Sequence, residues 1–333
     1  MSQPKVILTG FADEGPVSKR AEEQLTMCRA LGLSYYSLRF IDVGEGVKNV
    51  MLLTDSEVAR LQKLHEEFEI RVSSIGSPIG KVKLLDVDDG TSNRYVPFER
   101  YLTEEVSRAV ELAQAFGAKL IRGFSFYPPK GDDPWKYVEL AAHHLAAITE
   151  VCQQGGVFFG LEVEANLVGR NGELLQALAS QVDHPHLRLV FDGANFICQG
   201  YSAAETFQHY ALMKNRLGWL HIKDYELEPD FEGKDYVDEE MLRHFVPADR
   251  GDVGHERILR DLKGLLPALT EELQALGLPG FFLDLEPHLK GGGQFGGFSG
   301  VDGYGVALRA LCRVLDYVGI GYDLTCYDDL RKA

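Results

Sequence analysis

Short apolar runs alternate with longer amphipathic segments along almost the whole chain. The short runs are rich in β-branched and aromatic residues and are bounded by turn residues, which is typical of buried strands. Strands separated by helical segments favour parallel pairing over antiparallel hairpins. The pattern predicts strands at residues 5–10, 35–40, 70–75, 119–124, 158–162, 187–192, 218–221 and 281–286.

The longer segments place apolar residues at every third or fourth position, the period of a helix that packs one face on a core. Thr54, with Glu57 three residues later, has the spacing of a capping box at a helix start. Gly32 and Gly117 follow the last turns of two other helices. The pattern predicts helices at 19–31, from Thr54 onward, and at 101–116, 135–154, 172–181, 203–214, 256–276 and 303–318.

Eight strand–helix units predict an α/β fold whose sheet closes into a (β/α)8 TIM barrel. The alternative is an open, doubly wound sheet, which usually carries a GxGxxG turn after its first strand. The corresponding residues 9–15 read TGFADEG and lack that motif. We therefore expect residues 1–333 to form a single barrel domain, with long loops at about 77–100, 225–255 and 288–302.

Composition narrows the class of partner. Hydrophobic residues make up 45% of the chain and charged residues 25%, so a large core can form. The formal net charge of −16 disfavours nucleic acid. The chain shows no signal segment, no run long enough to span a membrane, and five cysteines without metal-finger spacing. We expect a cytoplasmic protein with a small-molecule partner, no nucleic acid and no membrane contact.

Four metal-capable side chains stand at the ends of four consecutive predicted strands: Glu162, Asp192, His221 and Glu286. If the strands are parallel neighbours, these side chains converge at one face of the sheet, where the active sites of barrel enzymes lie. Two glutamates, an aspartate and a histidine form a mostly oxygen-donor set. Such a set suits one divalent ion: Mn²⁺, Co²⁺, Zn²⁺ or Mg²⁺.

Each of these side chains also has a structural interpretation. Asp192 could cap the next turn, His221 could be a satisfied core histidine, and Glu162 could pair with a basic residue. Glu164 has the same strand parity as Glu162, so either could be the ligand, and we favour Glu162. The coincidence at four strand ends favours the metal site over these separate explanations.

Further polar residues near the predicted strand ends are candidates for substrate contact. Lys223 and Asp224 could instead form a loop ion pair, and Arg39 and Lys81 could neutralise the carboxylates of the rim. A plain loop histidine is the alternative for His288. The substrate-binding candidates are Glu164, Asn195, Lys223, Asp224, His288, Arg39 and Lys81.

Several segments together resemble the sugar phosphate isomerase/epimerase family, whose members have xylose-isomerase-like TIM barrels. The resemblance extends over nearly the whole chain, including an N-terminal GFADE segment and the SPIGK segment at 77–81 that resemble an uncharacterised branch. The motifs that carry it are LEVE at 161–164, FDGANF at 191–196, HIKD at 221–224 and LEPHL at 285–289.

The resemblance implies that Glu162, Asp192, His221 and Glu286 bind one divalent metal. It also implies that Glu162 and Glu286 are the catalytic acid/base pair on opposite faces of the substrate. Epimerases of this family have a substrate-binding histidine three residues after the aspartate, where this chain has Asn195. The histidine-rich ligand set of endonuclease IV, another member, is absent from this sequence.

A carboxylate beside a carbon next to a carbonyl can move its proton, and a metal stabilises the resulting enediolate. We expect a divalent-metal-dependent isomerase or epimerase of a sugar, keto-sugar or polyol derivative, phosphorylated or not. The alternative with the same site is a metal-dependent lyase or dehydratase acting on 3-oxo sugars or glycosides. A non-catalytic sugar-binding barrel ranks lower. Apolar helix faces permit a homodimer or homotetramer.

Overall fold

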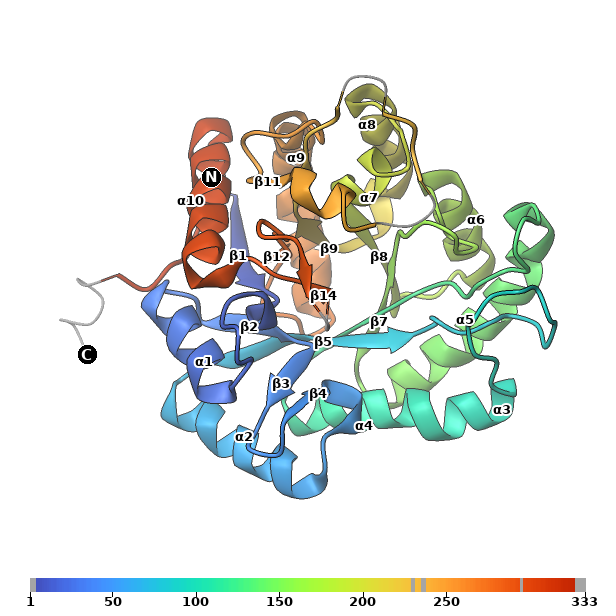
Figure 1. Cartoon of the computed structure of the whole chain (residues 1–333), viewed down its shortest axis with the longest axis horizontal. Coiled ribbons are helices and arrows are strands. Elements are labelled where there is room, and N and C mark those ends of the chain that lie inside the picture. Colours follow the sequence, from blue (N-terminus) through green and yellow to red (C-terminus); the bar gives the residue numbers. More distant parts are fainter. Residues whose placement is uncertain (1–3, 229–230, 235–237, 294–295, 327–333) are drawn as a thin grey trace.

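A computed structural model describes residues 4–228, 231–234, 238–293 and 296–326. Parallel strands surround a packed interior, and helices surround the strands (Figure 1). The strands end within a few residues of the predicted positions. The eight of the ring are β1 (Lys5–Gly10), β2 (Tyr35–Leu38), β5 (Arg71–Ile79), β6 (Leu120–Gly123), β7 (Phe158–Glu162), β8 (Leu187–Asp192), β9 (Leu217–Ile222) and β12 (Phe282–Leu285).

The sheet runs in the order β15-β1-β12-β9-β8-β7-β6-β5-β2, and all of its paired neighbours are parallel. A parallel bridge between Phe11 and Ser37 joins the first and second strands and closes the ring. The ninth strand, β15 (Gly321–Tyr322), pairs with the start of β1. The TIM barrel predicted from the alternating pattern is therefore confirmed.

Each helix connects two strands and packs its apolar face outside the ring (Figure 1). Thr54 and Glu57 form the predicted capping box. A short helix, α7 (Gly193–Ile197), follows β8 and was not predicted. The others are α1 (Ala21–Ala30), α2 (Asp55–Glu67), α3 (Phe98–Tyr101), α4 (Ser107–Ala115), α5 (Val138–Gln154), α6 (Gly172–Val182), α8 (Ala203–Met213), α9 (His255–Ala275) and α10 (Gly300–Val318). A π-helical turn at Leu102–Val106 joins α3 to α4.

The predicted long loops contain structure of their own. The loop at 77–100 is shorter than expected, because β5 continues to Ile79 and α3 begins at Phe98. The loop at 225–255 contains the strand pair β10 (Asp224–Tyr225) and β11 (Phe245–Val246), and the loop at 288–302 contains β13 (Gly292–Gly293) and β14 (Gly296–Gly297). Residues 229–230, 235–237 and 294–295 of these loops lie outside the described residues.

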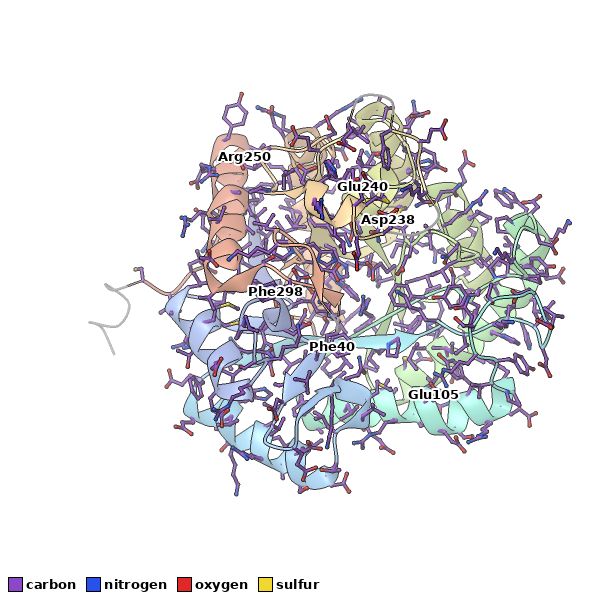
Figure 2. The ribbon with its side chains drawn as sticks, in the orientation of Figure 1. Phe40, Glu105, Asp238, Glu240, Arg250 and Phe298 are labelled. Atoms are coloured by element: carbon purple, nitrogen blue, oxygen red, sulfur yellow. The ribbon has the colours of Figure 1, made fainter. Side chains whose placement is uncertain are left out.

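The loop after β9 packs on the loop after β12. The Phe245 ring lies 5.0 Å from the His288 ring, centroid to centroid. The segment that carries Asp238 and Glu240 lies beside the loop that carries Phe298 (Figure 2). A further hairpin, β3 (Phe40–Asp42) with β4 (Val47–Asn49), follows β2. Among the described helices, none is long and apolar enough to cross a membrane.

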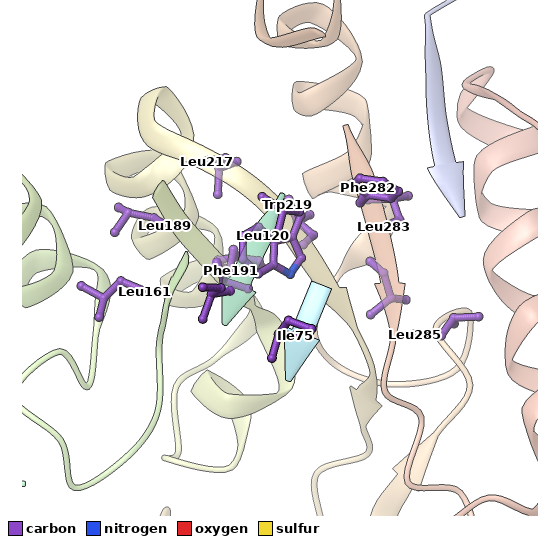
Figure 3. Close-up of a cluster of buried hydrophobic side chains, with 14 of the residues drawn as sticks. Ile75, Leu120, Leu161, Leu189, Phe191, Leu217, Trp219, Phe282, Leu283 and Leu285 are labelled. Atoms are coloured by element: carbon purple, nitrogen blue, oxygen red, sulfur yellow. The ribbon is translucent and has the colours of Figure 1, made fainter. Parts of the chain in front are cut away.

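The interior of the ring is filled by side chains from alternate strand positions. Trp219 lies between the strands, whereas Leu161 and Leu189 lie on their outer side (Figure 3). Gly160 makes room for the Trp219 indole, because a Cβ at this position would be 1.9 Å from the Trp219 Cη2 atom. Two residues further along their strands, Glu162 and His221 point the same way. The packed layer around Trp219 is therefore the floor beneath these two side chains.

We expect Gly160→Ala to destabilise the fold by roughly 1–3 kcal/mol, because the added methyl group meets the indole in a filled interior. Gly264→Ala is the matched control. Gly264 lies on the exposed side of α9 with no atom within 4 Å of an added Cβ, so alanine should stabilise the helix by about 1 kcal/mol. Denaturant unfolding measures both changes. Equal stability of the two variants would contradict the packing of Gly160 against Trp219.

Candidate metal centre

The four side chains at the strand ends form one compact cluster inside the mouth of the barrel. Glu162, Asp192, His221 and Glu286 are all buried, and one ligand atom of each lies within 4.8 Å of the others. Glu162 ends β7, Asp192 ends β8, His221 lies on β9 and Glu286 follows β12, so neighbouring strands bring them together. We refer to these residues as the four-residue cluster.

His221 presents its Nδ1 atom to all three carboxylates of the cluster. This nitrogen lies 3.0 Å from Glu162 Oε1, 3.8 Å from Asp192 Oδ2 and 3.7 Å from Glu286 Oε2. Burial would lower the pKa of His221, but the charge and hydrogen bond of Glu162 raise it to about 9. In the absence of a metal ion, the His221 ring is therefore protonated at neutral pH. Its positive charge lies where a metal ion among the carboxylates would lie.

Lys223 supplies a second positive charge to the cluster. Its Nζ atom lies 3.0 Å from Asp192 Oδ2 and 3.1 Å from Glu286 Oε2, and the side chain is buried. Burial would lower the pKa of Lys223, but Asp192 and Glu286 outweigh burial and raise it well above the usual value. The lysine is therefore charged and competes with any metal ion for the same two oxygens.

Two arginines hold the outer oxygens of the glutamates. Arg122 Nη1 donates to Glu162 Oε2 at 3.1 Å, and Arg39 Nη1 donates to Glu286 Oε1 at 2.5 Å. Burial would raise the pKa of Glu162, but His221 and Arg122 lower it to about 2. Burial would likewise raise the pKa of Glu286, but Lys223 and Arg39 hold it well below the usual range. Both glutamates are therefore ionised at neutral pH.

The donor set fits a divalent cation. Asp192 Oδ1 accepts a hydrogen bond from the Asn195 amide, whereas Asp192 Oδ2 is buried and lies 3.0 Å from Lys223 Nζ and 3.8 Å from His221 Nδ1. Burial raises the pKa of Asp192 despite the nearby Lys223 charge. A divalent ion would take the place of these cations at Asp192 Oδ2. Three carboxylates and one imidazole suit Mg²⁺, Mn²⁺, Co²⁺ or Zn²⁺.

A second group of acidic residues, Asp13 and Glu14, borders the cluster and was missed in the sequence. His288 Nδ1 lies 2.8 Å from Glu14 Oε1, and the His288 amide donates to Glu14 Oε2. Arg39 also contacts Asp13 at 3.1 Å and Glu14 at 3.4 Å. Both carboxylates lie in the loop after β1, which ends at Gly10, so a search extended from the strand ends into the following loops would have found them.

A buried hydrogen-bond network lies one layer below the cluster. Asp284, two residues before Glu286, accepts a hydrogen bond from Ser37, which also contacts Ser73 and Ser74. Burial raises the pKa of Asp284 to about 7. Asp284 Oδ1 and His221 Nε2 are both buried without a hydrogen-bond partner among the described residues. An aspartate inside an otherwise apolar strand was the available sequence signal.

The remaining candidates lie outside the cluster. Glu164, despite its matching parity, turns to Lys81, whose Nζ atom lies 2.7 Å from Glu164 Oε2. The Asn195 side chain donates to the Val163 carbonyl, so it braces the turn after β7. Asp224 accepts from two backbone amides, including that of Val253 at 3.0 Å, and holds the segment before α9.

Comparison with known families identifies the fold independently. Residues 25–288 match the model of the Xylose isomerase-like TIM barrel family, and the chain belongs to this family. No curated protein sequence matches the chain at a significant level. The resemblance inferred from the LEVE, FDGANF, HIKD and LEPHL segments is therefore confirmed.

Several solved structures share the fold at low sequence identity. A Xylose isomerase-like TIM barrel protein from Mycobacterium smegmatis in complex with magnesium is 18% identical, with a TM-score of 0.61 and coverage of 95% of this chain and 98% of that one. The probable 3-DHS dehydratase AsbF from Bacillus anthracis is 16% identical, with a TM-score of 0.62 and coverage of 92% and 98%. A D-psicose 3-epimerase from Clostridium cellulolyticum H10 is 14% identical, with a TM-score of 0.58 and coverage of 94% and 98%. Proteins that share this fold thus include an epimerase and a probable dehydratase.

We expect Lys223→Gln to lower the stability of the metal-free protein toward unfolding. We also expect metal to stabilise this variant more than it stabilises wild type. Removing one partner from buried ion pairs costs roughly 3–5 kcal/mol, and a divalent ion can replace the lost charge. Thermal unfolding with EDTA and with Mn²⁺ measures both effects. Lys214→Gln is the control, because Lys214 pairs with Asp261 in a partly exposed position and its loss should cost at most about 1 kcal/mol in either condition. An equal loss for Lys223→Gln with and without Mn²⁺ would exclude competition between lysine and metal.

Elemental mass spectrometry should find about one divalent ion per wild-type chain after Mn²⁺ loading, and much less in Glu286→Gln, which lacks one donor. Loading should weaken as the pH falls below about 9, because a metal ion must displace the proton of His221. Glu271→Gln, at an exposed position of α9, is the control and should retain the ion. No ion in wild type or control after loading would mean that the carboxylates serve only in ion pairs.

Proposed function

We propose that this protein is a divalent-metal-dependent isomerase or epimerase of a sugar, keto-sugar or polyol derivative. The observation that carries the proposal is the arrangement of the four-residue cluster along the arc β7-β8-β9-β12. Glu162 and Glu286 lie at the two ends of this arc, and Asp192 and His221 lie between them. Two carboxylates thus approach one small volume from different strands, as transfer of a proton on and off a carbon atom requires.

The charge states of the glutamates support the role of base for either of them. A residue that removes a proton from carbon must be unprotonated, and the low pKa of both Glu162 and Glu286 provides this state at neutral pH. Arg122 and Arg39 each hold one oxygen of a glutamate and so fix the direction of the other oxygen. A divalent ion in the cluster would act as a Lewis acid on the carbonyl of the substrate.

In the proposed reaction, Glu162 takes the proton from a carbon next to the carbonyl group, and Glu286, after taking up a proton from solvent, gives that proton to carbon from its side of the substrate. Glu162 then releases its proton to solvent, which restores both carboxylates. Return to the same carbon gives an epimer, and return to its neighbour gives an isomer. Lys223 and Arg39 are placed to contact substrate oxygens once the carboxylates have another cation to pair with. A small-molecule carbohydrate is the partner that this site suits. The acidic chain disfavours nucleic acid.

A lyase or dehydratase is the second candidate, and the His288–Glu14 pair favours it. His288 lies beside Glu286 and is held by Glu14 at 2.8 Å, so a second acid is available to protonate a leaving group. In that reaction Glu162 removes the proton from carbon, and the bond to the β-substituent breaks. A 3-oxo sugar or glycoside has the required acidic carbon beside its carbonyl group.

Incubation of the Mn²⁺-loaded protein with keto-sugars and 3-oxo-glycosides in D₂O tests both candidates. We expect deuterium at a substrate carbon, together with an epimer or isomer, by NMR. Glu162→Gln and Glu286→Gln should lower the rate by roughly 10²–10⁴-fold, and the metal content of each variant separates lost proton transfer from lost metal. Glu271→Gln should retain the wild-type rate.

The outcomes are distinct. Release of water or an aglycone without isomer formation would contradict the isomerase proposal and support the lyase. Bound sugar that stays unchanged and free of deuterium throughout a long incubation would indicate a non-catalytic sugar-binding barrel.

A further inference from the structure

A second cavity opens near the mouth of the barrel, on the side of β6 and β7. It has a volume of about 910 Å³ and is lined by the loops that follow β5, β6 and β7 and by Lys234 of the loop after β9. Its apolar surface comes from Tyr127, Pro129, Pro134 and Leu167. None of the residues of the four-residue cluster lines it. The proposed reaction therefore leaves this cavity without a role.

Two cationic side chains that line this cavity have no carboxylate partner among the described residues. Among the described residues, neither Lys130 Nζ nor the guanidinium group of Arg170 makes a hydrogen bond or an ion pair, and Arg170 is only partly exposed. The lining carboxylates are already engaged. Asp89 pairs with Lys83 at 2.6 Å, Asp132 accepts from Tyr137, and Asp133 caps the turn that begins at Pro134.

The cavity is thus lined by three cationic side chains, of which Lys234 pairs with Asp238, and by an apolar wall. Of the lining carboxylates, only Asp89 has a cationic partner within the described part of the chain, and Asp132 and Asp133 accept hydrogen bonds from neutral groups. In a chain with a net charge of −16, free cations beside a hollow favour an anionic ligand. The apolar residues favour a ligand whose anionic group is attached to a ring or chain. A carboxylate or a phosphate matches the guanidinium group of Arg170 equally well.

The cavity lies close enough to the cluster to hold another part of the same molecule. Asn166 lines the cavity and is four residues after Glu162, so their Cα atoms are at most about 14 Å apart. The Gln199 side chain links Arg170 to the segment after Asp192, because it donates both to the Arg170 carbonyl and to the Asn195 carbonyl in α7. Two linked rings of sugar size would span such a distance.

We infer that this cavity binds an anionic, partly apolar second unit of the substrate, so that the substrate is larger than a simple sugar. Its keto-sugar unit would lie at the four-residue cluster, and a unit bearing a carboxylate or phosphate would lie between Tyr127, Lys130 and Arg170. The inference rests on the proposed function for its first half. The anion-binding property of the cavity stands without it.

Ligand-observed NMR with phenyl phosphate, benzoate and phenol tests the cavity without any turnover. We expect phenyl phosphate and benzoate to bind wild-type protein, with affinity that falls as salt is added, and phenol to bind much more weakly. Arg170→Gln should weaken binding of the two anions roughly tenfold, and Lys130→Gln, at an exposed position that folding tolerates, should weaken it by a smaller factor. Lys63→Gln is the control, since Lys63 is exposed on α2, outside the cavity.

The same titration in EDTA and in Glu286→Gln separates this inference from the proposed function. Unchanged binding of phenyl phosphate there is expected, because the metal cluster does not line the cavity. Once a substrate is known, Arg170→Gln should raise KM for an anionic substrate and leave kcat and the KM of a neutral analogue unchanged. Failure of the anions to bind wild type, or equal binding by wild type and Arg170→Gln, would overturn the inference even if the enzyme turned over sugars.

Discussion

Burial of carboxylates in the mouth of the barrel is the constraint on which the rest of this structure depends. Glu162, Asp192 and Glu286 meet within a few ångströms of one another, and none is more than slightly exposed. An ion moved out of water loses several kcal/mol of solvation, and only nearby opposite charge restores it. The protein therefore surrounds these carboxylates with His221, Lys223 and the two arginines. A metal ion would enter a site whose charges are already arranged around an inner cation.

Much of the fold and cluster could be predicted from the sequence, because both follow from local rules. The period of the apolar residues defines strand and helix, and the last inward residue of each buried strand defines the cluster. Arg39 was named in the sequence as a residue that could neutralise rim carboxylates, but its particular partner could not be found in this way. Arg39 and Glu286 are 247 residues apart, and only the closure of the ring brings them together. Residues one layer deeper, such as Asp284, escaped notice because a single polar residue barely alters an apolar run.

Strand parity also has a limit that Glu164 illustrates. It shares the parity of Glu162, but β7 ends at Glu162, and beyond that point alternation no longer fixes direction. Lys81 then attracts the Glu164 carboxylate outward, over the rim. The sequence also predicted the long loops without any secondary structure of their own. Short strand pairs formed within two of them, since exposed backbone groups gain hydrogen bonds by pairing locally.

The position of Trp219 makes the interior of the barrel optically observable. Its indole ring lies 6.4 Å from the His221 ring and is fully buried, whereas the other tryptophan of the chain, Trp135, is 51% exposed. A buried indole emits at shorter wavelength than an exposed one, so we expect the blue-shifted part of the emission to come from Trp219, directly beneath the four-residue cluster. A paramagnetic ion there would quench that emission, and a diamagnetic ion would leave it bright. Fluorescence could thus distinguish Mn²⁺ from Mg²⁺ in the unlabelled protein, in real time and without a substrate.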